Sequence, residues 1–186
     1  MENETKDRKT ILSFIISVAG LVAIASMFFP FIVLSKNGYN SGSYTGFEVA
    51  FGYSNNYVTM NTNVVLVIAM VLTIVAILVS FFFYKNKFAN LVCAILYIAS
   101  AVAFLFISLY AKSVGQIFID DLTTISAAYG AIFSGIFSLF AGAGSIYLTV
   151  LCCKEENKEN GEDKKEKKEE PSKKEDKEEV KYIDEE

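Results

Sequence analysis

The sequence predicts an all-α membrane protein: a four-transmembrane-helix bundle with a small extracellular loop, able to form a short β-hairpin, and a disordered charged C-terminal tail. Two observations lead to this fold class. Of the 186 residues, 53% are hydrophobic, and most of these fall in four long runs without a formal charge. The 20% of residues that are charged are concentrated at the two ends of the chain. Apolar membrane segments and a solvated tail account for this separation.

The four uncharged runs cover residues 11–34, 64–84, 88–111 and 127–153. A helix needs about 20 residues to cross a hydrocarbon core about 30 Å thick, and each run is long enough. In lipid, the backbone N–H and C=O groups must be satisfied within the spanning segment, so we expect helices despite the many β-branched residues. The outer loops are then residues 35–63 and 112–126.

Charge separates the chain into three regions. Residues 1–10 form a polar N-terminus, residues 11–153 the transmembrane domain, and residues 154–186 a tail of alternating Lys and Glu. The tail has too few apolar residues to fold alone, so disorder is expected from its composition. Because its carboxylates outnumber its lysines, the composition argues against a nucleic acid partner.

The first run could also be a cleaved signal peptide. Lys6, Arg8 and Lys9 precede it, and the segment from Ala23 to Ala25 resembles a cleavage site. The apolar stretch nevertheless continues to Leu34, beyond the 7–15 residues typical of a signal peptide. We therefore favour an uncleaved first span.

Basic residues near the span ends predict the orientation, because cytoplasmic flanks carry an excess of Lys and Arg. One side of the bundle collects seven of these residues, and the other side collects Lys36 and Lys112. The seven are Lys6, Arg8, Lys9, Lys85, Lys87, Lys154 and Lys158. This asymmetry places both termini in the cytoplasm, with the chain in the cell (plasma) membrane. Frequent Asn, Lys, Ile, Phe and Tyr are typical of a low-GC bacterium.

The first outer loop contains one regular pattern. Phe47, Val49, Phe51 and Tyr53 alternate with smaller or polar residues, which predicts a short strand with an aromatic face. A lone strand is not stable in water, so we expect it to pair within the loop. Its face is a possible extracellular contact surface, or else part of a lid that lies on the bundle.

A row of small residues marks the fourth run. Ser126, Gly130, Ser134, Ser138 and Gly142 recur every four residues. Such rows let helix backbones approach closely in lipid. The row is a seam for packing within the chain or for a homo-oligomer; a pore lining of hydroxyls is a third interpretation.

The residue types exclude several chemistries. The chain has no His, which removes Ser-His and Cys-His catalysis and histidine metal sites. No Asp, Glu, Lys or Arg lies within the four runs, whereas proton-coupled carriers place such groups in the membrane. We predict no enzyme activity, no cofactor and no metal.

Two functions stay open. The first is a non-enzymatic accessory, scaffold or interaction protein whose partners are the lipid bilayer and either a membrane protein or a second copy of the chain. The second is a small oligomeric pore, holin-like or transporter-like, assembled through the small-residue row.

Overall fold

The computed structural model describes residues 2–36, 38–55, 58–114 and 123–169. Its helices and strands follow one another along the chain as α1 (Glu2–Ala25), the 3-10 helix η1 (Ser26–Phe28), β1 (Pro30–Lys36), β2 (Tyr39–Thr45), α2 (Gly46–Phe51), β3 (Tyr53–Ser54), β4 (Thr59–Met60), α3 (Val64–Phe82), α4 (Lys87–Leu105), α5 (Ile107–Val114), β5 (Thr123–Ala127) and α6 (Tyr129–Glu169).

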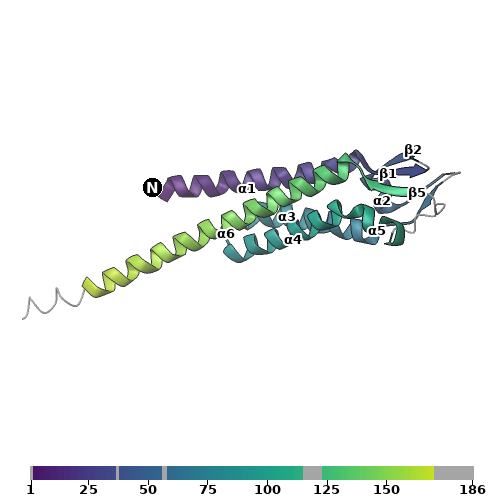
Figure 1. The fold of residues 1–186 in the computed structure, drawn as a ribbon. Coiled ribbons are helices and arrows are strands. Elements are labelled where there is room, and N and C mark those ends of the chain that lie inside the picture. The colour runs from purple at the N-terminus through teal and green to yellow at the C-terminus, as the bar shows by residue number, and fades with distance from the viewer. Residues whose placement is uncertain (1, 37, 56–57, 115–122, 170–186) are drawn as a thin grey trace, which may run out of the picture.

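Four helical segments within these ranges are long and apolar enough to cross a membrane, as the sequence predicts. They are Asp7–Phe28, Val64–Phe82, Lys87–Leu105 and Tyr129–Glu155. The helices pack in a ring in which α1 contacts α3 and α6, while α4 contacts the same two helices. Figure 1 shows the strands gathered at one end of the bundle, which we call the sheet end, with the N-terminus at the opposite end.

The outward faces of the bundle are also apolar. Phe14, Ile68, Ile95 and Phe140 are each between half and two thirds exposed, and further Val, Leu and Ile side chains accompany them along the helices. An exposed apolar surface this large is unusual on a soluble monomer. It is the surface expected of helices that face lipid, which agrees with a multi-pass membrane protein.

The sheet end contains a three-stranded antiparallel sheet with the order β2-β1-β5, and a two-stranded β3–β4 hairpin. The central strand, β1, pairs Ile32 with Tyr44 of β2 on one side and with Ala127 of β5 on the other. Hairpins are therefore present in the first outer loop, but they are formed by β1–β2 and β3–β4 and not by a strand over Phe47–Tyr53. A sheet that joins both outer loops goes beyond the all-α prediction.

The predicted first span, residues 11–34, is wrong at its C-terminal end. The helix ends at Ala25, and the strand β1 begins at Pro30. Proline lacks the N–H that would continue a helix. The residues from Phe31 to Leu34 are all apolar, and the first three are aromatic or β-branched, which favours a strand. The absence of charge did not distinguish this strand from the helix before it.

The strand predicted over Phe47–Tyr53 is also wrong for most of its length. Gly46–Phe51 is the helix α2, and only Tyr53 lies in a strand. Thr45 and Glu48 form a capping box, which favours a helix start. The alternating aromatic residues also satisfy helical spacing, since Phe47 and Phe51 are four residues apart and stack with ring centroids 6.3 Å apart.

The third and fourth predicted spans need correction at the sheet end. The third, residues 88–111, is interrupted after Leu105, and a short helix, α5, follows. The fourth, residues 127–153, becomes helical only at Tyr129, because Thr123–Ala127 pairs with β1 as strand β5. Ser126 thus belongs to a strand and not to the helical row predicted for it.

At the other end, α6 extends past the bundle to Glu169 (Figure 1). Residues 154–169 are therefore helical where disorder was expected, and their Lys and Glu content is compatible with helix. The rest of the predicted tail, residues 170–186, lies outside the described residues.

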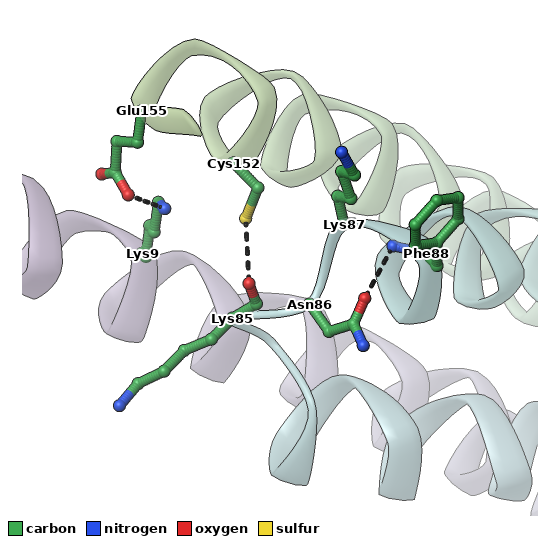
Figure 2. Close-up of a pocket in the computed structure, with 7 residues that line it drawn as sticks. All are labelled: Lys9, Lys85, Asn86, Lys87, Phe88, Cys152 and Glu155. Atoms are coloured by element: carbon green, nitrogen blue, oxygen red, sulfur yellow. Dashed lines mark hydrogen bonds and ion pairs between the residues drawn. The ribbon is translucent and has the colours of Figure 1, made fainter. Parts of the chain in front are cut away.

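The end of the bundle opposite the sheet has a pocket of about 530 Å³, which we call the Lys pocket (Figure 2). It is lined by Lys9, Lys85, Asn86, Lys87, Phe88, Cys152 and Glu155. Lys9 of α1 forms an ion pair with Glu155 of α6, so that these two helices are joined at this end.

Candidate functional site

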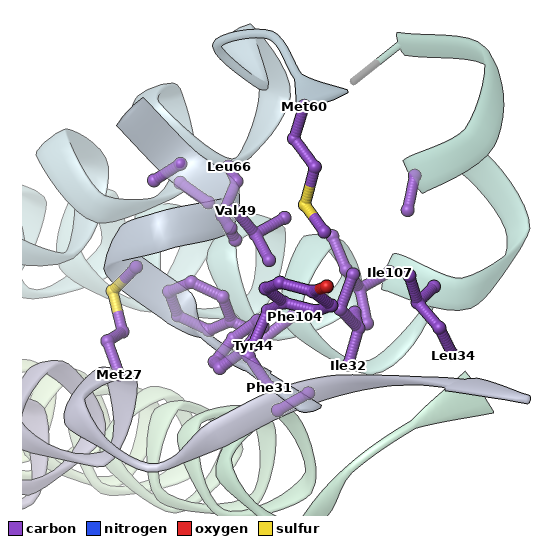
Figure 3. Packing of buried hydrophobic residues seen from close by; sticks show 14 residues of the cluster. Met27, Phe31, Ile32, Leu34, Tyr44, Val49, Met60, Leu66, Phe104 and Ile107 are labelled. Atoms are coloured by element: carbon purple, nitrogen blue, oxygen red, sulfur yellow. The ribbon is translucent and has the colours of Figure 1, made fainter. Parts of the chain in front are cut away.

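The sheet end combines strands with a short helix, and we call it the sheet cap. It consists of β1, β2, β5, α2 and the β3–β4 hairpin. Its core is continuous with the interior of the bundle (Figure 3). Phe31 of β1 and Phe104 of α4 are both fully buried and meet edge to face, with ring centroids 5.9 Å apart. The sheet is thus fixed to the helices by side chains from both.

Other elements supply the rest of this shared core. Val49 comes from α2, Leu66 from α3, Ile107 from α5 and Met27 from η1, and each is at most 1% exposed. Figure 3 shows these side chains converging between the sheet and the helix ends. Because these four elements join β1 and α4 in one cluster, the cap has little freedom to move independently of the bundle.

The helix α2 is held by its own capping box. The Glu48 carboxylate accepts hydrogen bonds from the Thr45 N–H at 2.7 Å and the Thr45 hydroxyl at 2.9 Å. The Glu48 N–H donates in return to Thr45 Oγ1 at 3.3 Å. Gly52 ends the helix with φ +93°, a backbone conformation that favours glycine.

Replacing Glu48 with alanine is expected to lower the free energy of unfolding by about 1 kcal/mol, the typical effect of losing a helix cap. Glu48→Gln keeps an acceptor for the Thr45 N–H and should cost clearly less. Thermal unfolding in detergent, followed by the reaction of buried Cys93 with a thiol-specific dye, measures both. Equal losses for the two variants would show that the box does not hold α2.

The predicted contact residues do not form one face. Val49 is buried, whereas Phe51 is 55% exposed and Phe47 is half-buried. Tyr53 packs against Tyr44 instead, with ring centroids 5.4 Å apart. Burial raises the pKa of the Tyr44 phenol, and the nearby Tyr53 and Glu48 add to the shift. The phenol therefore stays neutral at physiological pH.

Exposed or half-buried aromatic side chains lie at the junction between the helices and the sheet cap, and we call them the aromatic rim. Phe28 is 71% exposed and lies 4.7 Å from Phe47, ring centroid to centroid. Phe29 similarly lies 6.2 Å from Tyr129. The rim consists of Phe28, Phe29, Phe47, Phe51 and Tyr129. Tyr is enriched at membrane–water interfaces because its ring is apolar and its hydroxyl polar, and Tyr129 is the rim residue of this kind. The sequence does not predict the rim, because its members come from η1, the residue that follows it, α2 and α6.

The strand β2 is the polar edge of the cap. It pairs with β1 on one side, and in the described part of the chain no strand pairs with its other side. Ser43 is exposed, and Tyr39 at the hairpin tip is 81% exposed. An edge strand offers backbone N–H and C=O groups to a partner. The sequence prediction missed β2, because glycine and serine are poor strand formers.

The small residues of α6 face other elements of the same chain. A Cβ added at Gly130 would lie 2.6 Å from the Pro30 carbonyl oxygen, and one at Gly142 would lie 3.1 Å from Ile98 Cγ1. Ser134 is fully buried and donates to the Ala23 carbonyl oxygen at 2.8 Å.

The two remaining members of the predicted row differ from each other. Ser138 is fully buried. Ser126, in β5, is exposed. Four of the five residues of the row therefore share the inward face of α6, at the close contacts with α1, β1 and α4.

The middle of the bundle is filled by side chains. Tyr97, Ile16 and Leu148 are each at most 2% exposed and belong to one cluster. Next to them, the Ser13 hydroxyl donates to the Ser80 carbonyl oxygen at 2.6 Å, and Ser17 and Ser80 share a hydrogen bond of 3.2 Å. Buried hydroxyls of this kind join helices in lipid.

Comparison with known proteins adds no family assignment. No protein-family model matches the chain, and no curated protein matches it significantly. The geometry of the sheet cap, the bundle interior and the Lys pocket is therefore the basis for the function proposed below.

Proposed function

We propose that the chain is a non-enzymatic, multi-pass protein of the plasma membrane that acts by contact, as an accessory or scaffold protein, through its sheet cap. The observation that carries this proposal is the shared core around Phe31 and Phe104, which fixes a folded cap to the bundle. The cap thus presents the exposed β2 edge in a set orientation.

The orientation proposed is cap outside, with both termini in the cytoplasm. Lys9, Lys85 and Lys87 lie together at the end opposite the sheet, while Lys36 ends β1 at the sheet end. This distribution supports the positive-inside orientation. Half-exposed Tyr129, at the start of α6 beside the cap, supports a membrane boundary near that depth.

We expect the contact to be made by strand addition or by side chains of β2. An extended partner segment that adds to a sheet edge gains affinity from main-chain hydrogen bonds. Exposed Tyr39 and Ser43 would lie beside such a segment. A protein partner with an accessible strand or extended loop fits this surface.

The alternative, a small pore, has less support from the arrangement of side chains. The bundle interior is occupied by Tyr97, Ile16 and Leu148, and Gly130 and Gly142 pack against elements of their own chain. A pore would have to form between copies, along helix faces that carry Phe and Ile. Such faces suit lipid better than water.

Two measurements test the proposal together. Photo-crosslinking residues at Tyr39 or Ser43 should give discrete adducts with another protein in intact cells. The same residue at Phe140, an outward position on α6, serves as the control and should give mainly lipid adducts. Purified protein in liposomes should release no entrapped dye. Reproducible dye release by the wild-type protein, with no adducts from β2, would favour the pore instead.

A further inference from the structure

The Lys pocket lies outside the sheet cap, and the proposed function does not use it. It lies between α1, α6 and the turn that joins α3 to α4 (Figure 2). Its lining includes three lysines and a single glutamate, so its net charge is positive. We infer that this pocket binds the phosphate group of an anionic phospholipid.

The pocket walls are fixed in place by contacts between helices. The Asn90 side-chain amide donates to the Tyr84 carbonyl oxygen at 2.8 Å, and Cys152 of α6 lies 3.7 Å from the Lys85 carbonyl oxygen, Sγ to O. The Lys9–Glu155 ion pair closes the opposite wall. The backbone of the turn between α3 and α4 is therefore held against α6. The ammonium groups of Lys85 and Lys87 lie over the neighbouring Tyr84 and Phe88 rings, 5.7 and 5.3 Å from the ring centroids.

The start of α4 adds to the attraction for an anion. Asn86, Lys87 and Phe88 line the pocket at this helix N-terminus. Asn86 caps the helix through its side-chain oxygen, which accepts from the Phe88 N–H at 2.9 Å. The helix dipole places partial positive charge at this end, next to the charges of Lys85 and Lys87.

The surroundings favour a lipid over a soluble phosphate. Phe88 is 68% exposed beside the pocket, and Leu91, Val92 and Ile95 continue an exposed apolar face along α4. A phospholipid could place its phosphate at the lysines and its acyl chains along that face. Basic pockets between membrane helices recognise anionic headgroups in this way. The inference rests on the proposed membrane placement, but not on which end faces the cytoplasm.

The test is a binding titration of the purified full-length protein by native mass spectrometry. The probes are phosphatidylglycerol, phosphatidylcholine with the same acyl chains, and glycerol phosphate. We expect phosphatidylglycerol to bind best. Each lysine near a membrane surface contributes about a fivefold gain for an anionic lipid, so Lys85→Gln with Lys87→Gln should weaken binding at least about tenfold. Lys36→Gln, an exposed lysine at the sheet end, should leave binding unchanged.

Three results would overturn the inference. Equal binding of phosphatidylcholine would show that the lysines do not select an anion. Unchanged phosphatidylglycerol binding by the double variant would place the lipid elsewhere. Glycerol phosphate that binds as tightly as phosphatidylglycerol would indicate a soluble phosphate ligand. A failure of the proposed function is distinguishable from a failure of this inference. The proposed function is tested by extraction of the protein from the membrane and by crosslinks at β2, and neither depends on Lys85 or Lys87.

Discussion

Replacing Gly130 with alanine is expected to destabilise the protein strongly, although only one methyl group is added. That methyl would lie 2.6 Å from the Pro30 carbonyl oxygen, 2.9 Å from that of Ser26 and 3.0 Å from that of Phe29. All three atoms belong to the backbone, so no side chain can turn away. Overpacking typically costs about 1–3 kcal/mol, and a backbone obstacle places this variant at the upper end.

Gly142→Ala is the matched control on the same helix. Its added methyl would approach Ile98 Cγ1 at 3.1 Å, and the Ile98 side chain can yield. Alanine also favours a helix interior over glycine by about 1 kcal/mol, which offsets the contact. Thermal unfolding, followed through Cys93, should show a large loss at Gly130 and little change at Gly142. Similar values for both would mean that α6 does not approach β1 this closely.

Replacing Phe31 with alanine should have the largest effect of any single truncation in the sheet cap. Phe31 is fully buried against Phe104, where the sheet meets the bundle. A buried Phe→Ala substitution costs about 3–5 kcal/mol, from lost burial and from the cavity left behind. We expect a matching fall in unfolding temperature, and faster proteolysis of the β1–β2 hairpin.

Phe28→Ala provides the comparison, since Phe28 is 71% exposed and lies only three residues earlier. Truncation of an exposed side chain usually changes stability by less than about 0.5 kcal/mol. Comparison of the two single alanine variants of Phe31 and Phe104 with the double variant isolates the energy of the ring contact from that of burial. We expect the ring contact to contribute about 0.5–1.5 kcal/mol. If Phe31→Ala unfolded like Phe28→Ala, the sheet would not be anchored to the helices.

The four spanning helices could be predicted from sequence because their signal is local. Each depends on a run of uncharged residues longer than the hydrocarbon core is thick. The first span differs at its end, because the apolar residues after Pro30 extend the uncharged run although they form β1. A central strand such as β1, in which Phe31–Leu34 are all apolar, has no alternation of apolar and polar residues, so its pattern cannot be told from a helix segment.

The sheet could not be predicted because it joins segments far apart in the chain. Strand β5 depends on β1 for its pairing, with Val33 opposite Ser126. The segment Thr123–Ala127 has no distinctive pattern of its own. The helix α2 differs from the prediction for another reason. The alternation of Phe47, Val49 and Phe51 predicts a strand, whereas the capping box formed by Thr45 and Glu48 favours a helix.

The candidate sites could likewise be predicted only in part, because they join segments that are far apart in the chain. The small residues of α6 could be recognised as a packing row, but only the structure shows that Gly130 meets β1 and that Ser134 bonds to α1. The Lys pocket combines α1, the α3–α4 turn and α6. In the sequence these lysines indicate only the orientation of the spans, because no local pattern predicts that Lys9 lies near Lys87.

Single-cysteine labelling of intact cells tests the central claim, a membrane bundle with its sheet cap outside. Cys93, Cys152 and Cys153 are first replaced with serine or alanine, and one cysteine is then introduced at Tyr39 or at Lys85. A membrane-impermeant maleimide should label the Tyr39 position in intact cells, and the Lys85 position only after permeabilisation. Labelling of Lys85 in intact cells, with Tyr39 protected, would contradict the orientation, and recovery of the protein without detergent would contradict the membrane placement itself.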